Sequence, residues 1–158
     1  MIPLAERVKN VSKERLQQLI MAMEFVPQDK LQWRPSGCAQ TPVETYLQCG
    51  GSFLMAARAM RGRKVHWGDL YNEVLTTARS VPSLEEAKAA MERYYQEFLT
   101  ALEELDESQL EQMIEMPWGG SVPMSQFISL PAQHTCYYCG QLNFYETLLL
   151  KSPDTKPL

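Results

Sequence analysis

The stretch "SLEEAKAAMERYYQEFLTALEEL" (residues 83–105) predicts the fold class more clearly than any other part of the chain. Ser83 precedes Glu86 by three residues, which is the spacing of a capping box at a helix N-terminus. Apolar side chains then follow one stripe at helical spacing, formed by Leu84, Ala87, Met91, Tyr94, Tyr95, Phe98, Leu102 and Leu105. We therefore predict a long amphipathic helix that buries this stripe.

Two more helices are predicted on the N-terminal side of this stretch. Apolar residues recur at helical spacing from Pro3 until Pro27 ends the pattern. The segment "TPVE" (residues 41–44) then places a capping threonine, a proline at the first helical position and a glutamate three residues after the cap. This second helix is expected to end at about Arg61, before Gly62.

The last predicted helix begins near residues 121–124 and continues to about residue 150. Pro131 lies inside it, and an interior proline removes a backbone hydrogen bond and bends the helix. We therefore expect a kink between Phe127 and Pro131. Between the third and last helices, residues 106–120 are predicted to form a brief helical turn and a tight loop at Trp118, Gly119 and Gly120.

Four long helices in a chain of 158 residues predict an all-α protein, a four-helix bundle in one domain over residues 1–150. Residues 63–82 are interpreted as a long connection between the second and third helices, with a short helical turn at most. Such a connection permits those two helices to run in parallel. Residues 151–158 are expected to be a flexible tail.

The composition excludes several classes of protein. The net charge of −4 and the pI near 5.2 provide no basic face for nucleic acid. No apolar run approaches the roughly 18 residues that span a bilayer, and the N-terminus does not resemble a signal peptide. We therefore expect a cytoplasmic protein that binds neither nucleic acid nor membrane and keeps its cysteines reduced.

The segment "PAQHTCYYCGQLNFYE" (residues 131–146) combines a histidine with a CxxC pair. On a helix, Cys136 and Cys139 lie roughly 160° and 140° from His134, so the three cannot bind one ion. Cys136 lies too far inside the helix for a redox motif, and packing is the simpler interpretation of both cysteines. His134, Tyr138, Gln141 and Tyr145 share one face, which lies either toward solvent or around a polar centre.

Two segments resemble the DinB superfamily of bacterial four-helix bundles, which includes YfiT-like proteins. These segments are "WRPSGCAQTPVETYLQC" (residues 33–49) and "HTCYYCGQLNFYETLL" (residues 134–149). The resemblance extends over nearly the whole chain. It implies a bundle that binds a divalent metal through one histidine on the second helix and an HxxxH pair on the last.

Here the implied metal triad is degenerate. Gln48 occupies the position on the second helix, with Cys49 as the neighbouring alternative, and His134 and Tyr138 occupy the positions of the pair. An amide oxygen and a protonated phenol are weak ligands for zinc or nickel. No cofactor is therefore predicted, and Gln48, His134, Tyr138, Gln141 and Tyr145 become candidates for a polar pocket.

Two hypotheses remain open for the function. In the first, the protein is a metal-independent homodimeric bundle that binds a small molecule in this pocket. In the second, it is a metal-dependent enzyme of the thiol-transferase or hydrolase type, as the resemblance implies. Nine methionines and the small residues of the last helix favour a homodimer, which the resemblance implies too.

Overall fold

The computed structural model describes residues 1–116 and 119–149 of the chain. It confirms the all-α class. The helices are α1 (Pro3–Glu24), α2 (Pro42–Met60), α3 (Trp67–Ser80), α4 (Leu84–Glu104), α5 (Met124–Phe127) and α6 (Leu130–Leu149). Two short 3-10 helices, η1 (Gln28–Lys30) and η2 (Glu107–Gln109), and two short strands, β1 (Met113–Glu115) and β2 (Ser121–Pro123), complete the described elements.

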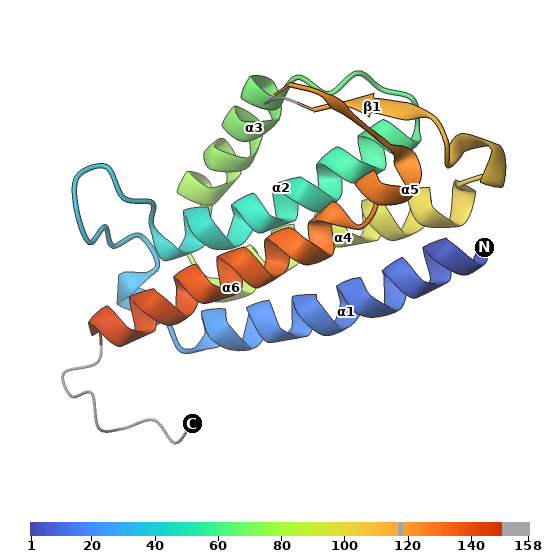
Figure 1. The fold of residues 1–158 in the computed structure, drawn as a ribbon. Helices are drawn as coiled ribbons and strands as arrows, with labels where there is room; N and C mark the ends of the chain where they lie inside the picture. Colours follow the sequence, from blue (N-terminus) through green and yellow to red (C-terminus); the bar gives the residue numbers. More distant parts are fainter. Residues whose placement is uncertain (117–118, 150–158) are drawn as a thin grey trace.

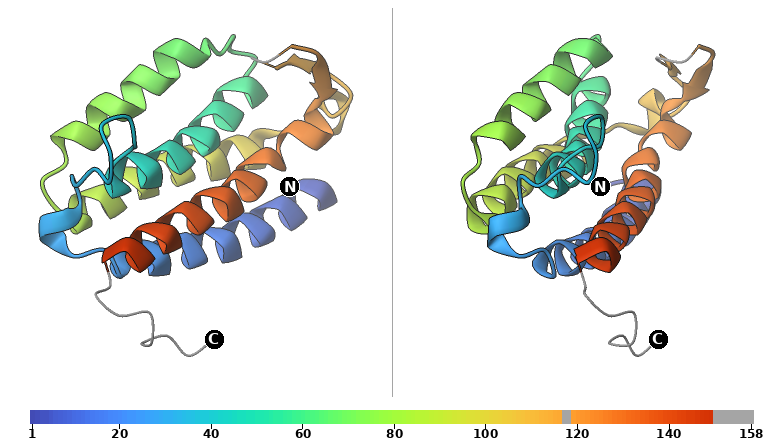
Figure 2. Two further views of the ribbon diagram at one scale, coloured as in Figure 1. Left: turned by 60° about the vertical axis from the view of Figure 1, so that its left-hand side comes forward. Right: turned by 90° about the vertical axis from the view of Figure 1, so that its left-hand side faces the viewer.

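The four long helices α1, α4, α2 and α6 form a bundle in which each helix contacts the next and α6 returns to α1. Figures 1 and 2 show that α2 and α4 run in the same direction, opposite to α1 and α6. The sequence had allowed this parallel pair because of the long connection between the two helices. The largest fully buried side chains, including Tyr46, Phe53, Phe98 and Leu19, fill the space between the helices.

The predicted starts of α2 and α4 are confirmed by their caps. At α2, Thr41 Oγ1 accepts the Glu44 amide at 3.1 Å and a Glu44 carboxylate oxygen accepts the Thr41 amide at 3.0 Å, which completes the capping box. At α4, Ser83 Oγ accepts the Glu86 amide at 3.2 Å. These bonds satisfy backbone donors that have no partner within the helix.

The connection between α2 and α4 differs from the prediction, since most of it is the 14-residue helix α3. Its buried side chains Leu70, Val74, Leu75 and Ala78 lie at helical spacing and pack against α2, outside the four-helix bundle. The helix escaped prediction because its N-cap, His66, makes no side-chain capping bond and because Gly68 lies in its first turn. Tertiary packing against α2 outweighs these weak local signals.

The predicted kink before Pro131 is a complete break. The helix α5 ends at Phe127, Ile128 and Ser129 form a turn, and α6 begins at Leu130. Pro131 is therefore the second residue of α6, a position where a missing amide hydrogen costs little. The break allows the chain to enter the bundle from β2.

The two strands form an antiparallel pair that was not expected, with Ile114 opposite Val122. Gly119 and Gly120 both have positive φ, at 96° and 79°, as the sharp return of the chain requires. Strands of three residues are too short to show an alternating pattern in the sequence. Trp118 and the tail at residues 151–158, for which the sequence made predictions, lie outside the described residues.

No helix in the described part of the chain has both the length and the apolar character needed to span a bilayer.

Candidate functional site

The predicted pocket residues meet between α2 and α6, which pack against each other. Gln48 projects from α2, and His134, Tyr138, Gln141 and Tyr145 project from α6. Tyr145 is buried at 7% exposure, and the other four side chains are half-buried. The polar stripe of α6 therefore faces α2 rather than open solvent.

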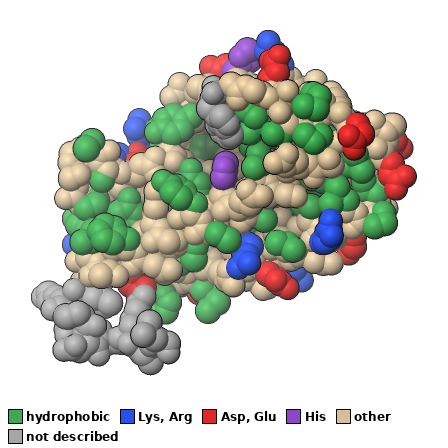
Figure 3. Space-filling model, in the orientation of Figure 1, with side chains coloured by type: hydrophobic (Ala, Val, Ile, Leu, Met, Phe, Trp, Pro, Cys, Tyr) green, Lys and Arg blue, Asp and Glu red, His purple; other side chains and the backbone are tan. Residues whose placement is uncertain are grey.

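Two hollows lie on the two sides of Gln48 and Tyr138, which line both. The smaller, of about 140 Å³, lies between α2, α3 and α6 and includes His134, Ser52, Trp67 and Tyr71. The larger, of about 650 Å³, extends along α6 toward the loop before α2, where Gln40, Gln141 and Tyr145 line it. Figure 3 shows this face of the molecule, where hydrophobic side chains and a histidine lie around a central hollow.

A chain of hydrogen bonds separates the two hollows. The Tyr138 hydroxyl donates to Gln48 Oε1 at 3.4 Å, and Gln40 Nε2 donates to the same oxygen at 2.8 Å. Gln48 Nε2 is buried and has no hydrogen-bond partner among the described residues. A buried amide donor without a partner is uncommon because losing its water is costly. The α2 side of the site therefore offers an unused donor.

His134 and Tyr138 are uncharged at neutral pH. Burial lowers the pKa of His134 below its ordinary value, which favours the neutral imidazole. Burial also raises the pKa of Tyr138 to about 12, so its phenol keeps its proton. The two rings lie edge to face with their centroids 6.5 Å apart. Together they form a neutral aromatic wall with hydrogen-bonding edges.

Cys49, the alternative to Gln48, directs its thiol toward Thr135 of α6. Its side chain is fully buried and its thiol donates to Thr135 Oγ1 at 3.4 Å. Burial raises the pKa of the Cys49 thiol to about 12, so it remains protonated and is a poor metal ligand. Of the two candidates, Gln48 is thus the residue that meets Tyr138.

The remaining donors do not fit a zinc or nickel ion. Gln48 Oε1 already accepts two hydrogen bonds, Tyr138 holds its proton, and His134 is a single imidazole. Structural and catalytic zinc sites use three or four histidine, thiolate or carboxylate ligands. No group of three histidine, cysteine, aspartate or glutamate side chains with metal-binding geometry occurs within residues 1–116 and 119–149.

Tyr145 and Gln141 complete the larger hollow, and Tyr145 fixes its outer wall. The Tyr145 hydroxyl donates to the Gln40 carbonyl at 2.7 Å and lies 3.3 Å from Thr45 Oγ1. The Trp33 ring packs edge to face on Tyr145, with centroids 6.4 Å apart. These contacts hold the loop before α2 against α6 and keep Gln40 within reach of Gln48.

The cysteines of the CxxC segment take no part in the site. Cys136 is exposed and its thiol lies 3.6 Å from the Ala132 carbonyl, one turn back on α6. The Cys139 thiol lies 3.8 Å from the Gln18 carbonyl of α1. Cys139, one of the small residues of α6, therefore packs against α1.

Sequence reasoning missed the part of the site that α3 provides. Trp67 and Tyr71 lie one turn apart at the start of α3 and line the smaller hollow with Leu70 and Val74. The spacing of Leu70, Val74 and Ala78 was the available signal for this helix. Gln40 was also missed, because nothing in the loop sequence indicates that its amide meets Gln48.

A sequence model of the DinB superfamily matches residues 11–142. No curated protein matches the chain significantly. An uncharacterised protein from Clostridium difficile 630 has a similar structure, with a TM-score of 0.71 and 16% identity, over 95% of this chain and 99% of the other.

The names of two further structural neighbours state a function. The mycothiol-dependent maleylpyruvate isomerase has a TM-score of 0.72 and 13% identity, over 89% of this chain and 61% of the isomerase. The colibactin self-resistance protein ClbS, solved with double-stranded DNA, has a TM-score of 0.65 and 14% identity, over 95% of this chain and all (100%) of ClbS. At these sequence identities, the similarity shows a shared fold only.

Proposed function

The chain belongs to the DinB superfamily, and on this basis we propose that it is a metal-independent member that binds an uncharged, planar small molecule between α2 and α6. The observation that carries the proposal is at Gln48, which lines both hollows and whose buried Nε2 has no partner among the described residues. A ligand carbonyl oxygen would accept this hydrogen and remove the cost of the unpaired donor.

The lining of the hollows indicates the class of ligand. None of the described residues around either hollow is an aspartate, glutamate, lysine or arginine. Aromatic rings dominate instead, with Trp67, Tyr71 and Tyr138 around the smaller hollow. Aromatic walls with a few polar groups suit a planar molecule held by stacking and one or two hydrogen bonds. The two hollows together form one cleft between α2 and α6. The absence of basic groups from its described lining also supports the expectation that this cleft does not bind nucleic acid.

The alternative is the metal-dependent enzyme of the thiol-transferase or hydrolase type. Its support is the fold shared with the mycothiol-dependent isomerase. The donor set at Gln48, His134 and Tyr138 does not fit the metal that this activity requires. Stoichiometric zinc or nickel in untagged protein, lost in His134→Ala, would revive this alternative. The double variant Gln48→His, Tyr138→His is a positive control, because it restores three imidazoles.

We expect benzamide, a neutral planar carboxamide, to bind to the cleft with saturable shifts of amide NMR signals from α2, α3 and α6. Its carbonyl would accept from Gln48 and its ring would pack on the aromatic wall. Gln48→Leu is expected to weaken binding by roughly tenfold, the value of about one hydrogen bond in a buried site.

The matched control ligand is benzoate, which has the same ring and a negative charge. It is expected to bind more weakly than benzamide, since none of the described residues that line the cleft is a lysine or arginine to balance a carboxylate. A control variant is Gln133→Leu, which removes an exposed amide of α6 that lines neither hollow and should leave the benzamide affinity unchanged. Equal binding of benzamide and benzoate, or full benzamide affinity in Gln48→Leu, would contradict the proposed site.

A homodimer is also part of the proposal. Tyr137, Phe144 and Leu148 are 63%, 60% and 45% exposed and lie on one face of α6, beside the larger hollow. A second copy packed on this face would cover the apolar stripe and narrow the cleft. Light scattering is expected to give a dimer mass at micromolar concentrations, and Phe144→Lys is expected to give a monomer. A monomer mass for the parent protein would exclude the dimer.

A further inference from the structure

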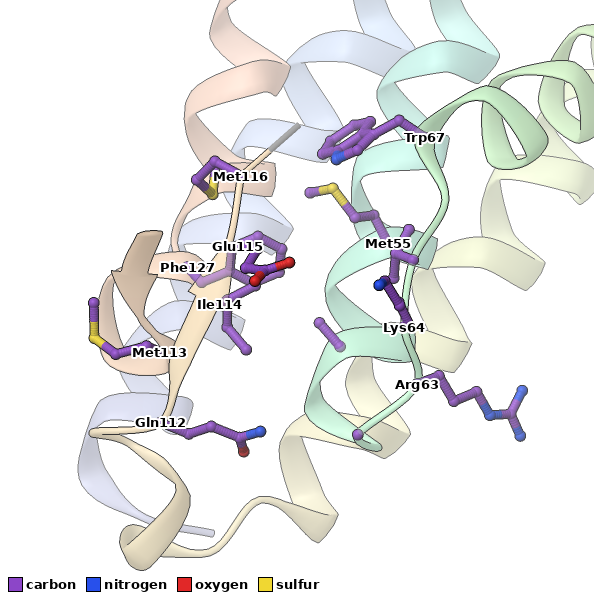
Figure 4. A pocket seen from close by; sticks show the side chains of 13 residues that line it. Met55, Arg63, Lys64, Trp67, Gln112, Met113, Ile114, Glu115, Met116 and Phe127 are labelled. Carbon is purple, nitrogen blue, oxygen red and sulfur yellow. The ribbon is translucent and has the colours of Figure 1, made fainter. Parts of the chain in front are cut away.

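A second pocket, of about 360 Å³, lies between β1 and the C-terminal end of α2. Figure 4 shows it between the hairpin strand and the segment that connects α2 to α3. Its volume falls within the range of about 300 to 1,000 Å³ that is usual for small-molecule sites. Trp67 lines this pocket and the smaller hollow of the cleft, but the other lining residues differ.

The floor of the pocket is apolar and well packed. Met55 and Phe127 are 0% and 2% exposed, and Met116 is 8% exposed. Ile114 extends from β1 toward this floor, and the Trp67 indole closes one end (Figure 4). Thioether and aromatic groups pack favourably against aliphatic, sulfur-containing and aromatic side chains. The floor therefore suits a short apolar group.

Two opposite charges face this floor from the two sides. In Figure 4 the Glu115 carboxylate points into the pocket from β1, and the Lys64 side chain lies across from it on the connecting segment. Neither residue takes part in the ion pairs formed among the described residues. The neighbouring Arg63 also lines the pocket, but its side chain extends away from it (Figure 4). One cation and one anion thus remain available above an apolar floor.

We propose that this pocket binds a small zwitterion with an apolar side chain, of the class of a free α-amino acid. Lys64 would bind the carboxylate, Glu115 would bind the ammonium group, and the side chain would lie on Met55 and Phe127. A ligand with only one of these charges would form one charge-assisted contact in place of two. A zwitterion satisfies both, which is the reason for choosing this class over simple anions or cations.

The proposal is tested with L-methionine and L-phenylalanine as probes, by titration of the isotope-labelled protein followed through amide NMR shifts. We expect saturable shifts in residues 62–67 and 112–116. N-acetyl-L-methionine lacks the ammonium group and L-methioninamide lacks the carboxylate. Each is expected to bind about tenfold more weakly than L-methionine, through the loss of one charge-assisted contact.

Two variants and a matched control locate the contacts. Lys64→Met is expected to weaken L-methionine binding about tenfold while leaving the affinity for L-methioninamide almost unchanged. Glu115→Gln is also expected to weaken L-methionine binding about tenfold, but it should leave the affinity for N-acetyl-L-methionine almost unchanged. Arg63→Met removes an adjacent cation that points away, and it should retain most of the affinity.

The following results would overturn the proposal. The first is no saturable shift with either amino acid. The second is equal affinity for L-methionine and its two derivatives, which would mean that the charges play no part. The third is an equal loss in Arg63→Met and Lys64→Met, which would indicate a general charge effect. Because Gln48 does not line this pocket, the Gln48→Leu variant should bind the amino acids normally, and failure of one site leaves the other testable.

Discussion

Glu44→Ala is expected to lower the free energy of unfolding by about 2 to 3 kcal/mol, because it removes a buried carboxylate that several groups share. The Glu44 side chain is 2% exposed and its Oε1 lies 2.7 Å from an Arg34 nitrogen and 3.2 Å from Arg79 Nε. Its other oxygen accepts the Thr41 amide at 3.0 Å. The two arginines are partly exposed, so most of the loss comes from the unpaired amide and the emptied space.

Glu44→Gln separates the charge from the hydrogen bond. The glutamine can still accept from Thr41, so we expect a smaller loss of about 1 kcal/mol. The free energy of unfolding of both variants is measured by urea denaturation followed by circular dichroism. Unchanged stability in Glu44→Ala would show that the capping box and its ion pairs contribute nothing.

The same carboxylate makes stability depend on pH. Burial alone raises the pKa of Glu44, but the Thr41 amide and the guanidinium groups of Arg34 and Arg79 outweigh it, and the pKa lies below its ordinary value. A group with a lowered folded-state pKa stabilises the protein fully at pH values above its unfolded-state pKa, which is about 4.3 for glutamate. This stabilisation is lost as the pH falls through the folded-state pKa. Glu44→Gln is therefore expected to lose less stability on acidification than the parent protein.

The second large effect is expected at Gly50, where α2 and α4 approach closely. A Cβ at this position would lie 2.7 Å from Tyr94 Cδ2 and 3.1 Å from Met91 Sδ. Both neighbours are buried in the core, so the helices must move apart to admit a methyl group. Gly50→Ala is expected to destabilise the protein by about 2 kcal/mol despite the better helix propensity of alanine.

Gly140→Ala is the matched control on α6. Nothing lies within 4 Å of a Cβ built at Gly140. The gain in helix propensity should therefore appear alone, as an increase of about 0.5 to 1 kcal/mol in the free energy of unfolding. Chemical denaturation of the two variants gives the comparison. If both substitutions stabilised the protein, the result would contradict the close contact between α2 and α4 at Gly50.

These two positions also affect the candidate cleft. Gly50 and Gln48 lie on the same helix, and Glu44 lies in the first turn of that helix and anchors Arg34 of the preceding loop. A shift of α2 away from α4 would change the contact between Gln48 and Tyr138. For this reason the binding experiments use substitutions at Gln48 and Gln133, which leave the core and the capping box intact.

The sequence predicted the long helices well because their signals are local. The capping pairs Thr41 with Glu44 and Ser83 with Glu86 involve residues three apart, and the apolar stripe of α4 follows from helical periodicity alone. The same periodicity placed His134, Tyr138, Gln141 and Tyr145 on one face of α6. It could not say whether that face was exposed.

The sequence did not predict α3, the complete break before α6 or the β-hairpin. The helix α3 gains its stability from packing Leu70, Val74 and Ala78 against α2, which no window of the sequence contains. The hairpin has only one three-residue pairing and depends on two glycines with positive φ. In each case a contact with a distant segment outweighs the local preference.

The sequence by itself determined the all-α class, the ends of α2 and α4, and the face that the polar residues of α6 share, because hydrogen bonds and periodicity within a few residues set these features. Only the tertiary structure decided that Gln48 meets Tyr138 while Cys49 turns to Thr135, and that Lys64 and Glu115 face one pocket. The orientation and environment of a side chain depend on helices that are remote in sequence and adjacent in space, and packing alone brings them together.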